Sequence, residues 1–213
     1  MYFCDKMQMR HMQSTHQQVL KKIQELDRGS VFFPEDFDSI GNNESVRQAL
    51  SRICKDGIIA RLSKGVYLYP VIDEELGIFY PSVERIAKAI SKRDKSRIVP
   101  TGTFALNRLG LSTQVPMNVI FLTDGIPRKI NIGKQTITFK HTNPKSLSFQ
   151  GEITPLVVAA LKEIGKDNVT PDELRKIKKV LQLEPRETAI SDAYLAPRWI
   201  TDIVLTLIKP RKR

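Results

Sequence analysis

Hydrophobic residues recur with a helical period across residues 44–55. Val46, Ala49, Leu50 and Ile53 follow one another at three- and four-residue spacing, which predicts a helix with one buried face. We expect Asn43 to cap the start of this helix and Gly57 to end it. The remaining face of the helix is polar, and it includes Ser45, Arg47, Gln48, Ser51, Arg52 and Lys55.

Two short apolar runs follow this helix and predict a β-hairpin. Residues 58–62 form the first run and residues 66–69 the second, with Ser63, Lys64 and Gly65 between them. Gly65 provides the backbone conformation that a tight turn needs. A hairpin of this size is marginal alone, so we expect it to pack on the neighbouring helices.

The residues before position 43 predict two further helices. Apolar residues recur at helical spacing over 19–26, with Ser14 or Thr15 as the cap and Gly29 as the end. Residues 34–37 begin with a proline and predict a short second helix. Three helices followed by a hairpin are the order of a winged helix-turn-helix domain, which we expect over residues 14–70.

The rest of the chain predicts a second domain of α+β class over residues 82–208. It begins with a helix capped by Ser82, and it includes a strand at 119–122, a hairpin around Gly133 and a helix capped by Thr154. Residues 170–173 form a capping box, and a helical extension follows Glu184. We expect residues 1–13 to be disordered, 71–81 to be a linker and 209–213 to be a basic tail.

Charge and composition narrow the class of partner. The net charge of +11 favours polyanions, with nucleic acid first among them. Residues 1–70 contain 10 Lys and Arg against 8 Asp and Glu, so most of the excess charge lies in residues 71–213. The sequence has 2 cysteines and no apolar run long enough for a membrane span or a secretory signal, so we expect a cytoplasmic protein without a membrane partner.

The polar face of the predicted third helix is suited to reading DNA. The major groove admits an α-helix, and Arg and Gln are the side chains best shaped for guanine and adenine edges. The turn of the hairpin would follow the backbone or the minor groove. The predicted DNA-binding residues are Asn43, Ser45, Arg47, Gln48, Ser51, Arg52, Lys55, Arg61, Ser63 and Lys64.

Two basic clusters in the second domain predict an auxiliary surface for nucleic acid or a seat for an acidic partner. The first contains Arg128, Lys129, Lys134, Lys140 and Lys145, and the second contains Arg175, Lys176, Lys178 and Lys179. Contacts of this kind would add salt-dependent affinity through counterion release. A soluble basic surface with no partner is the alternative interpretation.

No catalytic or cofactor motif stands out. The chain has no P-loop, dinucleotide fingerprint or nucleophile elbow, and its 3 histidines have no partner at a telling spacing. Gly29-Ser30 followed by Asp36 and Asp38 faintly resembles a nucleotidyltransferase site, but the gap is short and Pro34 argues against a central strand. We therefore expect no enzyme activity, no metal and no cofactor.

Several sequence motifs resemble AbiEi-type antitoxins of type IV (AbiE-like) toxin–antitoxin systems. In the first domain these are residues 45–52, 57–59 and 61–67, and in the second they are residues 100–102, 105–116 and 122–125. The resemblance implies an N-terminal winged-helix domain that represses its own operon. It also implies a C-terminal domain that helps to neutralise a nucleotidyltransferase-like toxin. The DNA-reading positions that it carries over are Arg47, Gln48, Ser51 and Arg52, with Lys64 in the wing.

Two alternative functions stay open at this point. One is a protein-interaction or RNA-binding module in which the winged helix is a scaffold and the basic second domain binds an acidic partner. The other is an enzyme with an unrecognised site in the second domain. If the DNA-binding form is a homodimer, its operator should contain an inverted repeat with half-sites about one helical turn apart, or a multiple of one turn.

Overall fold

The computed structural model describes residues 14–209, without the side chains of Lys145 and Ser146. The expected disordered segment 1–13 lies outside the described residues, and so does the basic tail after Lys209. The chain divides after Pro81 into two compact units. Both units combine helices with small sheets, which confirms the expected mixed α and β composition.

Helix α1 (Thr15–Gln24) opens the first unit. Ser14 caps it, because its hydroxyl accepts the backbone N–H of Gln17 at 3.3 Å while the Gln17 side chain accepts the N–H of Ser14 at 3.1 Å. The helix ends well before Gly29, the expected stop. Gly29 instead has a φ of +84° and donates its N–H to the carbonyl of Tyr69, so it leads the chain into a strand.

Strand β1 (Ser30–Phe32) was not predicted, because it exists only through pairing with a distant strand. A short 3₁₀ helix η1 (Pro34–Phe37) follows, and then α2 (Asn43–Lys55). The cap of α2 is Asn42 rather than the predicted Asn43. The Oδ1 atom of Asn42 accepts the backbone N–H of Ser45 at 2.8 Å, which satisfies a donor that the helix itself cannot.

The predicted hairpin is formed by β2 (Ala60–Ser63) and β3 (Val66–Tyr69), and β1 pairs with β3 to give the sheet order β1-β3-β2. Phe32 of β1 stacks on Tyr67 of β3 with ring centroids 5.8 Å apart. Helices α1 and α2 pack on these aromatic rings. The core of the unit includes Val19, Ile23, Phe37, Val46, Leu50 and Ile53, all of them fully or almost fully buried.

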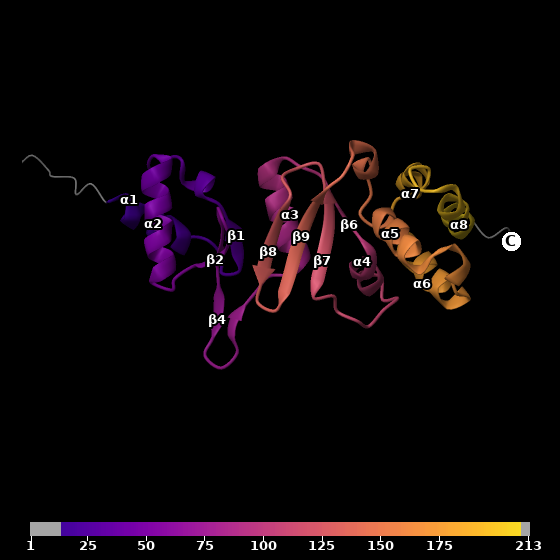
Figure 1. Cartoon of the computed structure of the whole chain (residues 1–213), viewed down its shortest axis with the longest axis horizontal. Coiled ribbons are helices and arrows are strands. Elements are labelled where there is room, and N and C mark those ends of the chain that lie inside the picture. Colours follow the sequence, from indigo (N-terminus) through magenta and orange to yellow (C-terminus); the bar gives the residue numbers. More distant parts are fainter. Residues whose placement is uncertain (1–13, 210–213) are drawn as a thin grey trace, which may run out of the picture. The chain divides into compact units, whose positions relative to one another are not determined.

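Residues 71–81, expected as a linker, instead contain a second hairpin. Strands β4 (Val71–Asp73) and β5 (Gly77–Phe79) pair with each other and with no other strand among residues 14–209. Figure 1 shows this hairpin extending away from α2 and the three-stranded sheet of its own unit. Its turn is built by Asp73, whose Oδ1 accepts the backbone N–H groups of Glu75 and Leu76, each at 2.9 Å.

The second unit is built on a four-stranded sheet of order β6-β7-β9-β8. Its strands are β6 (Ile98–Pro100), β7 (Asn118–Thr123), β8 (Arg128–Ile132) and β9 (Gln135–His141). Helix α3 (Val83–Asp94), capped by Ser82 as expected, precedes β6, and α4 (Gly102–Arg108) lies between β6 and β7 in the chain. The hairpin β8–β9 was predicted, whereas the parallel pairing of β7 with β9 was not.

Helices α5 to α8 complete the second unit and gather beside α4 (Figure 1). They are α5 (Thr154–Ile164), α6 (Pro171–Leu181), α7 (Arg186–Ala193) and α8 (Arg198–Ile208), with 3₁₀ turns η2 (Pro144–Leu147) and η3 (Lys166–Asn168). The predicted capping box of Thr170 and Glu173 is present. Buried residues from α4 to α8 form the second core, among them Ala105, Leu161, Ile177, Ala193 and Val204.

Two buried carboxylates hold the start of α5 from a distant part of the chain. Glu184 accepts the backbone N–H of Ile153 at 2.8 Å and that of Thr154 at 3.0 Å, and it also accepts the Thr154 hydroxyl. Asp192, 1% exposed, accepts the N–H of Gly151 at 2.7 Å and that of Gln150. Ile153 precedes the helix, so Thr154 is the first helical residue and not the predicted cap. The helical extension after Glu184 is an integral part of the second unit.

Candidate nucleic-acid interface

Helix α2 presents one polar face to solvent and buries the other. Val46, Ala49, Leu50 and Ile53 are at most 3% exposed and form part of the core. The exposed residues are Asn43, Glu44, Arg47, Gln48, Ser51, Arg52 and Lys55. The structure therefore brings the predicted residues of this helix together on one accessible surface, with the exception of Ser45.

Ser45 is half-buried and takes part in the helix start. Its backbone N–H and its hydroxyl both bind Asn42, the hydroxyl donating to the carbonyl at 2.9 Å. Gly41 lies against it, because a Cβ at position 41 would come within 2.8 Å of the Ser45 hydroxyl. Ser45 is thus a structural residue of the cap rather than an exposed reading residue.

Glu44 is a member of this face that sequence reasoning missed. Its Oε1 accepts a hydrogen bond from Nε2 of Gln48 at 3.0 Å, one helical turn away. This bond fixes the amide of Gln48 and places an acidic group among the cations. A carboxylate repels phosphate but accepts a hydrogen bond from the amino group of cytosine, so Glu44 belongs to the base-facing part of such a surface.

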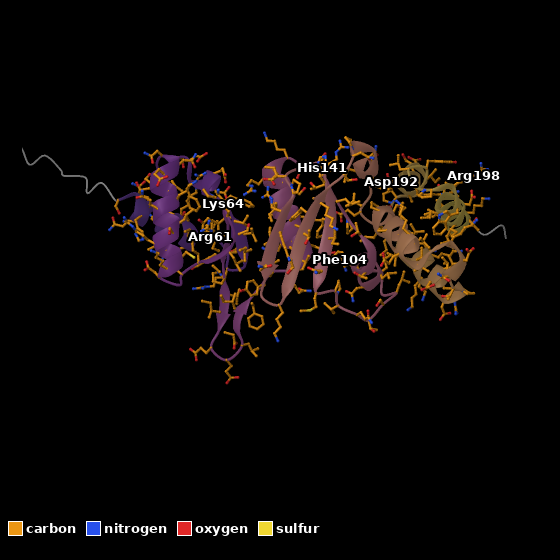
Figure 2. The ribbon with its side chains drawn as sticks, in the orientation of Figure 1. Arg61, Lys64, Phe104, His141, Asp192 and Arg198 are labelled. Carbon is orange, nitrogen blue, oxygen red and sulfur yellow. The ribbon has the colours of Figure 1, made fainter. Side chains whose placement is uncertain are left out.

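The β2–β3 hairpin carries two exposed cations, Arg61 and Lys64 (Figure 2). The strand register shifts between Arg61 and Ser63, and Nε of Arg61 donates to the carbonyl of Ser63 at 3.4 Å across this irregularity. Lys64 and Gly65 form the turn, and Gly65 has the expected positive φ of +72°. Ser63 is half-buried and Lys64 is exposed, so Lys64 is the more accessible side chain of the turn.

Tyr67 couples α2 to the hairpin electrostatically. It is 5% exposed, and burial raises the pKa of its hydroxyl above the ordinary value, an effect strengthened by Cys54. Arg61 and Arg47 oppose the shift, because their positive charges favour the ionised phenol. The cations of the helix and of the hairpin therefore lie close enough to influence the same hydroxyl.

Arg128 differs from the expectation of an exposed cation in an auxiliary surface. Its guanidinium lies 2.5 Å from Asp94, and the two side chains are 17% and 14% exposed. Burial lowers the pKa of Arg128, an effect that Asp94 opposes and neighbouring Arg93 adds to. This arginine ties β8 to the end of α3 and is not available to a polyanion.

The other cations of the β8–β9 hairpin are exposed. Lys129 lies opposite Thr138, so Lys129 and Lys140 point to the same face of the sheet at neighbouring positions. Lys134 lies in the turn. The side chain of Lys145 lies outside the described residues. Lys129 on the edge strand β8 also discourages pairing between sheets of different molecules.

The four cations of α6 have different roles. Arg175 forms an ion pair with Asp172, and Nζ of Lys176 donates to the carbonyl of Gly110 at 3.0 Å. Lys178 and Lys179 line an open hollow of about 600 Å³ between α6 and the end of α8. Arg175, Arg186 and Lys209 also line this hollow, together with Leu181, Leu207 and Ile208.

Asp36, one of the acids weighed as a catalytic or metal site, has a structural contact. The carboxylate of Asp36 accepts the backbone N–H of Phe33 at 2.8 Å, which caps the short helix η1. Cys54 is a half-buried free thiol packed against the first core. Among residues 14–209 no group of three or more His, Cys, Asp or Glu side chains is placed to hold a metal ion.

No helix among residues 14–209 is long and apolar enough to cross a bilayer.

Comparison with known proteins assigns the chain to a family. Residues 18–189 match the family of unknown function DUF6088, and the chain belongs to that family. The crystal structure of the RV2827C protein from Mycobacterium tuberculosis is similar to this chain with a TM-score of 0.42 and 12% sequence identity, over 91% of this chain and 81% of that one. No curated protein matches the sequence.

Proposed function

We propose that residues 14–70 are a winged-helix domain that binds double-stranded DNA in a sequence-specific manner. In this proposal α2 is the recognition helix and the β2–β3 hairpin is the wing. The observation that supports it most directly is the division of α2 into a buried apolar face and an exposed face with Arg47, Gln48 and Arg52. The order α1, η1, α2, β2, β3 with β1 completing the sheet is that of winged helix-turn-helix domains.

The exposed face of α2 has the side chains that major-groove recognition uses. An arginine such as Arg47 pairs with the O6 and N7 atoms of guanine through two hydrogen bonds, and a glutamine such as Gln48 pairs with adenine in the same manner. Gln48 would have to exchange its bond with Glu44 for one with a base. Lys64 and Arg61 would contact phosphates, which position the domain without reading sequence.

The wider biological role that we propose follows from the resemblance to AbiEi-type antitoxins. In it, the chain is a cytoplasmic autorepressor that binds its own promoter, and the second unit helps to neutralise a nucleotidyltransferase-like toxin. No cofactor, metal or catalytic step enters this proposal. A toxin gene next to the coding sequence would support the antitoxin role, and a solitary gene would count against it.

The test of DNA binding uses fluorescence anisotropy with the DNA upstream of the gene and with a shuffled duplex of the same composition. We expect tighter binding to the upstream DNA, and we expect Arg47→Ala and Gln48→Ala each to cost about 1–3 kcal/mol on that duplex alone. Arg198→Ala is the matched control, because Arg198 is an exposed arginine on α8 of the second unit (Figure 2).

Two results would contradict the proposal. One is equal affinity of the wild-type protein for the upstream and shuffled duplexes. The other is equal effects of Arg47→Ala and Arg198→Ala on both duplexes, because a general loss of charge would then explain the binding. Capture of an RNA or an acidic protein by a variant that has lost operator binding would favour the interaction-module alternative, for which the basic hollow beside α6 is the supporting feature.

A further inference from the structure

The β4–β5 hairpin exposes several large apolar side chains. Ile72 is 54% exposed, Leu76 75% and Phe79 49%. The two strands pair only with each other, so each leaves one backbone edge unpaired within the described part of the chain. A two-stranded hairpin is marginal in water, and exposed apolar residues beside unpaired edges mark a surface that contacts a partner.

Both faces of this hairpin are apolar. The register places Val71 opposite Phe79, and the next pair, Ile72 opposite Ile78, points to the other face. A flat partner surface would cover only one of these two pairs. A partner with a recess can contact both faces of the hairpin close to its tip.

The tip of the hairpin adds a requirement for positive charge. Asp73, Glu74 and Glu75 follow one another, and all three are exposed. The backbone N–H groups of Leu76 and Glu75 bind the carboxylate of Asp73 and lower its pKa, which favours its charged form. The partner surface should therefore combine an apolar floor with a basic rim.

The hollow between α6 and the end of α8 has this composition. Leu181, Leu207 and Ile208 are its apolar lining. Of the rim cations, Arg175 already pairs with Asp172, whereas Lys178, Lys179, Arg186 and Lys209 form no ion pair among residues 14–209. Glu184 also borders the hollow, but its carboxylate is bound to the start of α5. With a volume of about 600 Å³, the hollow can take the tip of the hairpin rather than the whole of it.

We propose that the β4–β5 hairpin of one copy of this chain docks into the α6–α8 hollow of a second copy, and that two copies exchange hairpins to form a dimer. The partner is a second copy because both complementary surfaces are present on every chain. The chain has a net charge of +11, but the tip of this hairpin is acidic. The tip of one copy is therefore attracted to the cations of a second copy. Reciprocal exchange uses both hairpins and both hollows and closes the assembly.

Charge reversal tests this dimer in the absence of DNA. Sedimentation or light scattering of the wild-type chain should give twice the monomer mass of 24.3 kDa. The variants Glu74→Lys/Glu75→Lys and Lys178→Glu/Lys179→Glu should each dimerise at least about tenfold more weakly, because like charges then face each other at both contacts. Mixing the two variants should restore dimers in a 1:1 ratio, since both contacts of the mixed pair again join opposite charges.

Matched reversals of exposed residues elsewhere control for a general effect of charge. Glu35→Lys on η1 and Lys129→Glu on β8 should leave the mass unchanged. A monomeric wild-type chain at every accessible concentration would overturn the proposal. It would also be overturned by a dimer that survives both hairpin and hollow reversals, or by two monomeric variants that stay monomeric when mixed.

Discussion

Tyr67 lies directly opposite Arg61 in the β2–β3 hairpin, and the charge of Arg61 lowers the pKa of the Tyr67 hydroxyl against the stronger, opposite effect of burial. Arg47 on α2 acts on the same hydroxyl. The ring of Tyr67 is stacked on Phe32, so its position is fixed by the core. One buried residue therefore connects the two cationic elements of the proposed interface.

The raised pKa of Tyr67 predicts how stability depends on pH. The folded state keeps the phenolic proton at pH values where the unfolded chain loses it. The stabilising contribution is complete below the ordinary tyrosine pKa of about 10 and is lost as the pH rises through the raised value. In urea denaturation from about pH 9 to 11, the free energy of unfolding of the wild-type chain should fall more steeply than that of Tyr67→Phe. Equal slopes for the wild-type chain and Tyr67→Phe would contradict this prediction.

Lys64 at the tip of the proposed wing predicts a change in salt dependence. If Lys64 contacts a phosphate, Lys64→Ala should reduce the slope of log K against log salt by about 1 and weaken binding to every duplex equally. Gln48→Ala should leave this slope unchanged while lowering the preference for the upstream DNA, because a base contact releases no counterion. Anisotropy titrations at several salt concentrations measure both quantities. Identical slopes for the wild-type protein and Lys64→Ala would exclude the phosphate contact.

The contact between Gly151 and Glu184 predicts a strong steric effect. A Cβ at position 151 would overlap the carboxylate of Glu184, which holds the start of α5. Gly151→Ala should lower the free energy of unfolding by about 1–3 kcal/mol. The same substitution in a Glu184→Ala background should cost much less, because the group that it displaces is gone. Equal costs in the two backgrounds, measured by thermal or urea denaturation, would show that the overlap is relieved elsewhere.

The ion pair of Arg128 with Asp94 predicts that Arg128 stabilises the fold, although the sequence analysis placed it in a basic surface that binds a polyanion. Arg128→Ala leaves Oδ2 of the largely buried Asp94 carboxylate without its partner, whereas Oδ1 keeps its ion pair with Arg93. We expect a loss of about 1–3 kcal/mol in the free energy of unfolding. Lys129→Ala is the control on the same strand, where an exposed side chain should matter by less than about 0.5 kcal/mol. Similar melting temperatures for the two variants would contradict the assigned role.

Local sequence signals predicted the elements of the first unit well where the interactions are local. The apolar stripe of α2 and the turn at Gly65 are encoded within a few residues, and both are observed close to the expected positions. Strand β1 was missed because its three residues become a strand only by pairing with β3, more than 30 residues later. The hairpin β4–β5 was taken for a linker because its acidic residues, which build the turn, suggested an exposed connection.

In the candidate site, too, local features were predicted and contacts between distant residues were not. Arg47 and Arg52 were expected to be exposed because they oppose an apolar stripe on one helix, and the structure places them so. The partners of Arg128 and Asp192 come from 34 and 42 residues away, a distance at which spacing carries no signal. Helix α7 was not predicted as a separate element, since its apolar residues do not follow a helical stripe.

The buried carboxylate of Asp192 determines where a shortened chain for expression of the second unit can end. The family match ends at residue 189, inside α7, and a chain cut at that point would lose Asp192, all of α8 and the buried side chains of Ala193, Ile200 and Val204. The N–H groups of Gln150 and Gly151 would lose their acceptor, and the apolar sides of α5 and α6 would face water. Expression of the second unit as a separate folded protein should therefore extend through Ile208, well beyond the shared family region.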